Sequence, residues 1–377
     1  MKNLLLFLLI ALIYSNISFC QKDNDDVHKF TMRYQVETTP VKNQGSSGTC
    51  WAFATTSFIE TEILRTGHGI HDLSEMYFVR YKLGEMAERY IRYHGTTNFS
   101  QGGQAHDVFY VVRHYGMVPE EIYDGKRIGE EKHNHGELEA VLKGMLDGVL
   151  KRRGGKLTPL WNEAVNSILD IYLGKPPLKF SYMDSMYTPE SFCKYTDFNP
   201  DDYIEITSYS HHPFYEKVEL ELPDNWIDEK YYNLPVDEMI SVIDYSLENG
   251  YSVIWDGDVS GDNFFSKRGY AVVPVDETEE DTTGMPEKEK VITQEMRQQS
   301  FDNFDVTDDH LMHITGIAED QEGTKFYYTK NSWGTEKRKY EGFWYLSEPF
   351  VKLKTIAICV NINAIPAEIK KELNLYH

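Results

Sequence analysis

The sequence is poor in basic residues, in cysteine and in long apolar segments, and each shortage excludes a class of protein. Lys and Arg number 38 against 60 Asp and Glu, which gives a net charge of −22. Binding to nucleic acid or to an anionic membrane surface is therefore not expected, because phosphate contacts need basic patches. The apolar run at residues 4–14 is too short to span a bilayer, so no integral membrane span is predicted. Four cysteines in 377 residues do not make a small disulfide-stapled fold.

The N-terminus has the features of a secretory signal peptide. Lys2 precedes the apolar run, and Ser18 and Cys20 supply the small residues expected before a cleavage site. Cleavage between Cys20 and Gln21 would give a secreted or periplasmic protein. Acylation of Cys20, as in a lipoprotein, is an alternative, but Phe19 fits a small-residue lipobox poorly.

Three cysteines remain after such cleavage. Cys359 lies in the apolar segment 355–360, which reads as a core strand, so a buried and inert thiol is expected there. Pairing of Cys193 with Cys359 stays open, since nothing in the sequence decides it.

Cys50 stands at the start of a predicted apolar helix over residues 51–65 that ends near Gly67. The positive end of a helix favours the thiolate, which is the nucleophilic form of cysteine. Gln44, shortly before it, carries a side-chain amide that could join the Cys50 backbone N–H in stabilising an oxyanion. A buried structural cysteine at a helix start is the alternative interpretation.

A nucleophilic thiol needs a base, and the base needs an orienting group. Residues 309–317 contain His310 and His313, which would face opposite sides of a strand. An Asn-Ser-Trp-Gly segment follows at residues 331–334. Glutamine, cysteine, histidine and asparagine in this order favour covalent hydrolysis over a binding role.

These segments resemble the papain-like cysteine peptidases, whose nucleophile signature is C-G-[SA]-C-[WY]. Ser47 replaces the first cysteine of that signature, and Thr49 replaces its serine or alanine. The family carries a histidine six residues before a glycine, a spacing that His310 and Gly316 share. The resemblance implies that His310 is the general base and acid. It further implies that Asn331 orients this imidazole and that Trp333 shields their hydrogen bond from water.

The spacing between these segments predicts a large insertion. His310 follows Cys50 by 260 residues, whereas papain-like enzymes place the histidine about 130–150 residues after the cysteine. Apolar residues at helical spacing predict two helices in the insertion, over residues 137–150 and 160–172. Segments 173–192, 232–237 and 252–259 resemble the bleomycin hydrolase and aminopeptidase C branch of the family, and the resemblance covers residues 44–366.

The resemblance implies an α+β, papain-like two-domain fold with the active site in the cleft between the domains. A helical left domain would carry Cys50, and a β-barrel-like right domain would carry His310 and Asn331. The expected units are a signal peptide (1–20), the N-terminal segment with the left domain (21–123), a helix-rich insertion (124–235) and the right domain with a C-terminal helix (236–377).

The cleft itself should bind peptide or protein substrates without a cofactor. In this family a Gly-Gly pair forms a cleft wall that bonds an extended peptide, a role that falls on Gly102 and Gly103, although an ordinary loop is the alternative. The segment 256–262 superficially resembles a calcium loop, but Lys267 stands where that loop needs Glu. No metal site is predicted.

Both ends depart from the family. Only 23 residues separate Gln21 from Gln44, which leaves no room for an inhibitory propeptide, and only 11 residues follow Pro366. Aminopeptidases of this branch have a C-terminal arm whose carboxylate captures the substrate amine, and this arm is missing here. Either His377 reaches the cleft by another route, or the cleft is open.

Three functions follow from this. An aminopeptidase-like cysteine peptidase is favoured, an open-cleft endopeptidase is the first alternative, and an inactive peptide-binding protein on the same fold is the second. An oligomer is possible, but the sequence does not support carrying over the hexamer of the family.

Overall fold

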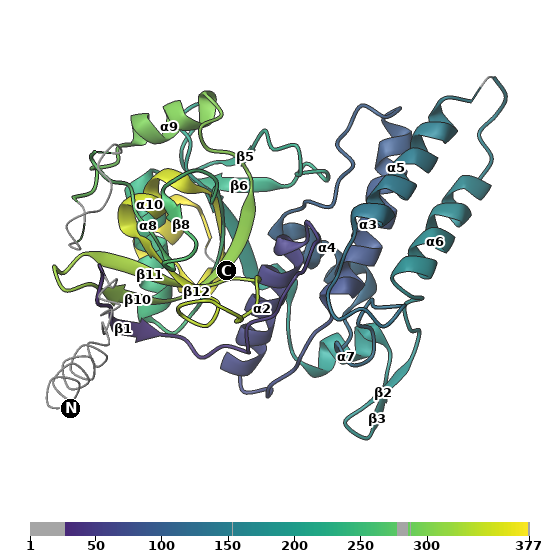
Figure 1. The fold of residues 1–377 in the computed structure, drawn as a ribbon, viewed down its shortest axis with the longest axis horizontal. Helices are drawn as coiled ribbons and strands as arrows, with labels where there is room; N and C mark the ends of the chain where they lie inside the picture. Colours follow the sequence, from purple (N-terminus) through teal and green to yellow (C-terminus); the bar gives the residue numbers. More distant parts are fainter. Residues whose placement is uncertain (1–26, 153, 277–285, 287, 376–377) are drawn as a thin grey trace, which may run out of the picture.

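The computed structural model describes residues 27–375 except 153, 277–285 and 287. Figure 1 shows two halves side by side: a sheet with its own helices, and a group of helices that includes α3, α5 and α6. Helix α2 (Cys50–Arg65) lies between them. The predicted signal peptide lies outside the described residues.

The helical half contains α2 and the elements that follow it up to residue 195. These are α3 (Glu75–Arg92), α4 (Ala105–Tyr115), α5 (Gly136–Leu150), α6 (Leu160–Tyr172), the hairpin of β2 (Phe180–Tyr182) and β3 (Ser185–Tyr187), and α7 (Pro189–Tyr195). Helices α5 and α6 confirm the two helices predicted in the insertion. Each buries only the apolar stripe that its sequence period indicated, and the fully buried members are Leu138, Leu142, Leu146, Val165 and Leu169.

The other half is built on one sheet with the strand order β5-β6-β4-β13-β7-β10-β11-β12-β9-β8, and β1 (Thr31–Gln35) pairs with β10. The strands are β4 (Tyr203–Thr207), β5 (Lys217–Glu219), β6 (Lys230–Asn233), β7 (Val253–Gly257), β8 (Phe264–Phe265), β9 (Tyr270–Ala271), β10 (His310–Glu319), β11 (Lys325–Lys330), β12 (Phe343–Ser347) and β13 (Thr355–Asn361). The two end strands of this order, β5 and β8, do not pair with each other among the described residues, so the sheet is long and open. The right domain is therefore an open sheet rather than the β-barrel-like domain expected from the sequence.

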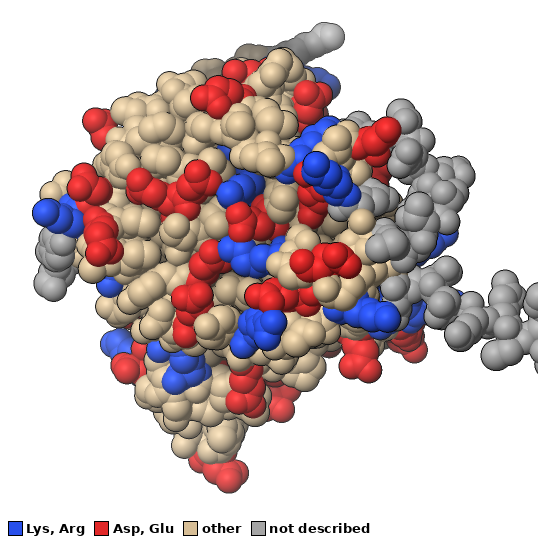
Figure 2. All heavy atoms as spheres, turned by 90° about the vertical axis from the view of Figure 1, so that its left-hand side faces the viewer, with Lys and Arg blue, Asp and Glu red and all other residues tan. Residues whose placement is uncertain are grey.

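Four helices accompany the sheet: α8 (Val236–Glu248), α9 (Gln294–Asp302), α10 (Glu348–Lys354) and α11 (Ala367–Glu372). Figure 2 shows the sheet side of the molecule, where acidic and basic side chains are interleaved. No described helix is long and apolar enough to cross a membrane.

The central strands bury both faces, and their alternating side chains join two different cores. Ile254, Leu311 and Cys359 pack with the helical half. Their chain neighbours Trp255 and Met312 pack in the core that contains α8. The alternation therefore assigns each residue of β7, and each residue of β10 before its bulge between Ile314 and Gly316, to one side of the sheet, which matters for the site below.

The described cysteines carry no disulfide: Cys50, Cys193 and Cys359 are free thiols. Cys359 is 1% exposed on β13, as expected for an inert core thiol. The structure therefore answers the open question of pairing in favour of two separate thiols.

Two lysines, the buried Lys330 and the half-buried Lys42, connect the halves through the segment that precedes α2. Lys330, at the end of β11, donates to the Thr39 carbonyl (2.7 Å) and to Ser57 Oγ on α2 (2.7 Å). Lys42 Nζ lies 2.8 Å from Glu75 Oε1 on α3. Burial lowers the pKa of Lys330 to about 8. Such contacts hold α2 against the sheet, and so fix the relative position of Cys50 and β10.

Candidate active site

Cys50 is the first residue of α2, and its side chain is buried at 8% exposure. Thr49 is the N-cap, but its side chain makes no capping hydrogen bond. The backbone N–H groups of Leu311 and Trp51 donate to the thiol and lower its pKa. Burial and the nearby carboxylates outweigh them and raise the pKa of Cys50 to about 12. Contrary to the expectation from the helix end alone, the resting thiol therefore keeps its proton and needs a base to remove it.

His310 is the first residue of β10 and is tied to Asn331, which follows β11. Nε2 of His310 lies 2.8 Å from Asn331 Oδ1, and the same oxygen accepts the Ser332 N–H at 2.7 Å. Because that oxygen is an acceptor, Nε2 carries the ring proton and Nδ1 is free to act as a base. Burial lowers the pKa of His310 to about 4, which favours this neutral form.

Trp333 lies against this pair, with its ring centroid 4.8 Å from that of His310. It also contacts Phe264 and Trp344 edge to face. The indole thus lies between the imidazole and the core of the sheet half. This position is consistent with shielding the His310–Asn331 hydrogen bond from water.

Gln44 connects the two halves at the site. Its backbone N–H donates to the Ser332 carbonyl (2.8 Å), and its Oε1 accepts from Ser332 Oγ. Its Nε2 donates one hydrogen to the Ser47 carbonyl at 2.7 Å. An amide nitrogen carries two hydrogens, so one remains for a developing oxyanion.

His313 occupies a different environment from His310. It is fully buried, its Nδ1 lies 2.9 Å from Ser57 Oγ, and its ring meets Phe58 edge to face. These contacts are with α2 rather than with Asn331. The structure therefore brings Gln44, His310, Asn331 and Trp333 together and leaves His313 out.

Gly102 and Gly103 lie beside the nucleophile helix, where packing leaves no space for a side chain. A Cβ on Gly102 would come within 1.9 Å of Asp224 Oδ2, and one on Gly103 would come within 3.0 Å of the Trp51 ring. The Gly102 carbonyl accepts a hydrogen bond from Lys82 Nζ. Close packing is thus a sufficient reason for both glycines, and their contact with substrate stays a prediction.

The sequence reasoning missed two carboxylates beside the site, Asp256 on β7 and Asp308 two residues before His310. Both act on the Cys50 thiol electrostatically. A charged residue in the middle of the apolar strand β7 was the available signal, because strands buried on both faces otherwise read as continuous apolar runs.

A helical half with a thiol at a helix start, packed against a sheet that carries a His-Asn pair, defines a papain-like cysteine peptidase. Residues 15–375 match the model of the Peptidase C1-like family. The chain belongs to this family, in the branch of the aminopeptidase C and bleomycin hydrolase enzymes, and is a cysteine peptidase.

Individual relatives are distant but cover most of the chain. It is 22% identical to cysteine proteinase 1, mitochondrial, from Saccharomyces cerevisiae (strain JAY291), over 93% of this chain and 80% of that protein. It is 23% identical to aminopeptidase C from Lactobacillus delbrueckii subsp. lactis, over 90% of this chain and 83% of that protein. The crystal structure of PepW from Lactobacillus rhamnosis HN001 superposes with a TM-score of 0.70 at 21% identity, covering 94% of this chain and 86% of that one. The papain-like fold expected from the sequence is confirmed.

Proposed function

We propose that this chain is an exported peptidase that hydrolyses peptide bonds by a Cys-His-Asn mechanism, with aminopeptidase-like specificity. The observation that carries the mechanism is the 2.8 Å contact of His310 with Asn331. His310 begins strand β10, and the N–H of the next residue, Leu311, reaches the Cys50 thiol. The names of the relatives, which include aminopeptidases C and W, support the specificity.

The first half of the reaction forms a thioester. Cys50 Sγ attacks the scissile carbonyl carbon while its proton passes to Nδ1 of His310, and the carbonyl π electrons move onto the oxygen. The Cys50 N–H and Gln44 Nε2 stabilise this oxyanion. When the carbonyl reforms, the C–N bond breaks and the leaving amine takes the proton from His310.

The second half regenerates the enzyme. Water attacks the thioester carbon and gives a proton to His310, and collapse of the second tetrahedral intermediate expels the thiolate of Cys50. The thiolate recovers the proton from His310, and the acid product gives its own proton to solvent and leaves as a carboxylate. Asn331 keeps the imidazole ring in one tautomer throughout both halves, because its Oδ1 accepts from Nε2.

Paired fluorogenic peptides test the specificity. The mature protein is given the same short peptide-coumarin amide with a free and with an acetylated amino terminus. We expect the free form to be cleaved at least about tenfold faster, a difference of about 1.4 kcal/mol in transition-state binding. Equal rates would support the open-cleft endopeptidase instead. Cleavage of neither by the folded protein would contradict the peptidase mechanism itself.

Export is part of the same proposal and rests on the sequence features of residues 1–20. The mature N-terminus should be Gln21, which mass spectrometry of the intact protein recovered outside the cytoplasm can measure. A mature chain that begins at an acylated Cys20 would support the lipoprotein, and a chain that keeps residue 1 would contradict cleavage.

A further inference from the structure

Asp256 and Asp308 place two carboxyl groups in contact beside the nucleophile. Asp256 is 3% exposed, and no described residue donates a hydrogen bond to either of its carboxylate oxygens. Its side chain faces that of Asp308, which is half-buried and accepts from Gln104 Nε2. A buried carboxyl group without a donor is costly, so its presence calls for a ligand or a proton.

The strand register fixes where this pair lies. Asp256 on β7 is opposite Leu311 on β10, and directly opposed residues project to the same face of a sheet. The N–H of Leu311 donates to the Cys50 thiol, and Asp308 precedes His310 by two residues. The pair therefore lies next to the nucleophile, on the side of β10 that meets the helical half.

Asp308 lines a cavity of about 510 Å³, so the pair can be reached from this cavity. The cavity has apolar walls that include Leu222, Phe301 and Val306, and no Lys or Arg lines it. A substrate group in this cavity would reach Asp308 directly, with Asp256 behind it.

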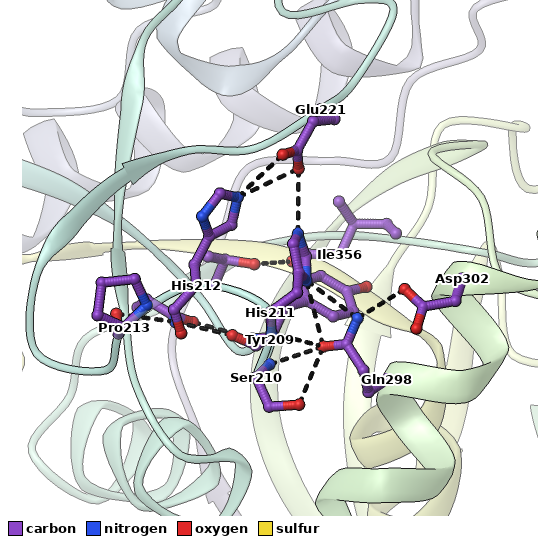
Figure 3. A network of polar contacts seen from close by, with 11 residues as sticks. Tyr209, Ser210, His211, His212, Pro213, Glu221, Gln298, Asp302 and Ile356 are labelled. Carbon is purple, nitrogen blue, oxygen red and sulfur yellow. Dashed lines mark hydrogen bonds and ion pairs between the residues drawn. The ribbon is translucent and has the colours of Figure 1, made fainter.

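The other carboxylates of the cavity already have partners. Glu221 accepts from Nε2 of both His211 (3.1 Å) and His212 (3.1 Å), as Figure 3 shows. In the same network Gln298 Nε2 donates to Asp302 Oδ1 at 2.8 Å. Asp224 accepts from Asn98 Nδ2 at 2.5 Å and from Ser100 Oγ at 3.1 Å. Only the Asp256–Asp308 pair thus combines burial, like charge and access to the cavity.

The described cationic groups near the pair, Lys82 and His106, already contact other partners. Nζ of Lys82 donates to the Gly102 carbonyl and lies 5.5 Å from the centre of the Trp51 ring. His106 Nδ1 lies 2.8 Å from Glu205 Oε2. Burial and the neighbouring acids raise the pKa of Asp308 to about 7 and that of Asp256 well above its ordinary value, which favours a proton on the pair. A bound cation would replace that proton.

We propose that the Asp256–Asp308 pair is the receptor for a cationic group of the substrate on the acyl side of the scissile bond. This inference rests on the proposed peptidase function. The α-ammonium group of an N-terminal residue fits best, because it is only two bonds from the carbonyl carbon that Cys50 attacks. A basic side chain one residue further out offers the same chemistry from a second source.

The test compares Asp308→Asn with the wild-type chain and with Asp305→Asn, which removes an exposed charge from the same loop. Each protein is given an aminoacyl-coumarin amide, its acetylated form, and two blocked dipeptide amides with either Arg or Leu at the second position from the bond. We expect Asp308→Asn to lose about 10- to 100-fold in kcat/KM on the free-amine substrate, as for a lost charge-assisted contact. The acetylated and Leu substrates should show no such loss, because they present no cation to the pair and the removed charge opposes ionisation of the Cys50 thiol. Asp305→Asn should match the wild type on all four substrates.

A selective loss on the blocked Arg substrate would assign the pair to a basic side chain. An equal loss on all four substrates, or no loss on any, would overturn the receptor. If the wild-type chain cleaves no substrate, or if cleavage persists without Cys50, the proposed function fails, which is a different outcome.

A stability measurement provides a second readout that does not depend on activity. The folded-state pKa of Asp308, about 7, lies above the ordinary value of 3.8. Folding therefore loses stability as the pH rises from about 4 to about 7, because ionisation is easier in the unfolded chain. We expect Asp308→Asn to have a higher Tm than the wild type at pH 8 and a similar Tm at pH 4.

The opposite result is a Tm of Asp308→Asn that lies below the wild-type Tm at pH 8 and closer to it at pH 4. That result would show that ionised Asp308 stabilises the folded protein through partners it already has, and it would contradict the proposal. Comparison of the two proteins separates Asp308 from the other titratable groups around the pair, which are present in both: Cys50, Lys82, His106, Asp107, Glu205, Tyr209, Asp224, Tyr231 and Asp309.

Discussion

Replacement of Cys50 by alanine should lower kcat/KM for every peptide substrate by about 10⁴-fold or more. The thiol is the only group placed at the start of α2 to form a covalent bond with the carbonyl carbon. Without it, the oxyanion donors and substrate binding leave only a small residual rate. The measurement is steady-state hydrolysis of a fluorogenic peptide by the purified Cys50→Ala chain, alongside its thermal unfolding.

Cys193→Ser is the matched control for this variant. Its thiol is half-buried on α7, donates to the Phe198 carbonyl at 3.6 Å and packs against the core of the helical half, away from the site. Activity should be unchanged, and alkylation of the wild-type chain should abolish activity in step with modification of one cysteine, Cys50. Hydrolysis that survives in folded Cys50→Ala, prepared free of other peptidases, would refute the covalent mechanism.

Local sequence patterns were sufficient for the parts of this protein that are set by short-range physics. The period of apolar residues predicted α5 and α6 correctly, because one-sided burial of a helix imposes a 3.6-residue repeat. The short motifs around Cys50, His310 and Asn331 identified the family for the same reason. Each motif carries its own local geometry: a helix start, a strand start and a turn.

The Asp256–Asp308 pair could not be found in this way, since it depends on the register between β7 and β10. The two residues are 52 positions apart, and a slip of one residue would turn Asp256 to the other face of the sheet. The lone acid in β7 was visible in the sequence, but its partner and its closeness to Cys50 were not.

The resting state of Cys50 illustrates a second limit. The helix position predicted thiolate stabilisation, and the N–H groups of Trp51 and Leu311 do act in that direction. Burial and the charges of Asp256 and Asp308 oppose them, and these depend on tertiary packing that no local motif encodes. Occupation of the acidic pair by a substrate cation would remove part of this opposition and so favour ionisation of the thiol where the substrate is bound.

His310→Gln should lower kcat for amide substrates by about 10²- to 10⁴-fold, the usual contribution of a positioned general acid and base. Glutamine can still contact Asn331, but it cannot accept the thiol proton or protonate the leaving amine. An activated ester, whose leaving group needs no proton, should therefore lose less than the amide of the same acyl group. The measurement is the ratio of ester to amide turnover in the variant and in the wild-type chain.

His313→Gln is the control that separates a catalytic imidazole from a structural one on the same strand. His313 contacts Ser57 and Phe58 of α2, so its replacement should lower the Tm while the folded protein keeps its kcat and its ester-to-amide ratio. The reverse result, with activity lost in His313→Gln and kept in His310→Gln, would reassign the base. A uniform loss on ester and amide in His310→Gln would place its role in attack alone, because protonation of the leaving group is the step in which the two substrates differ.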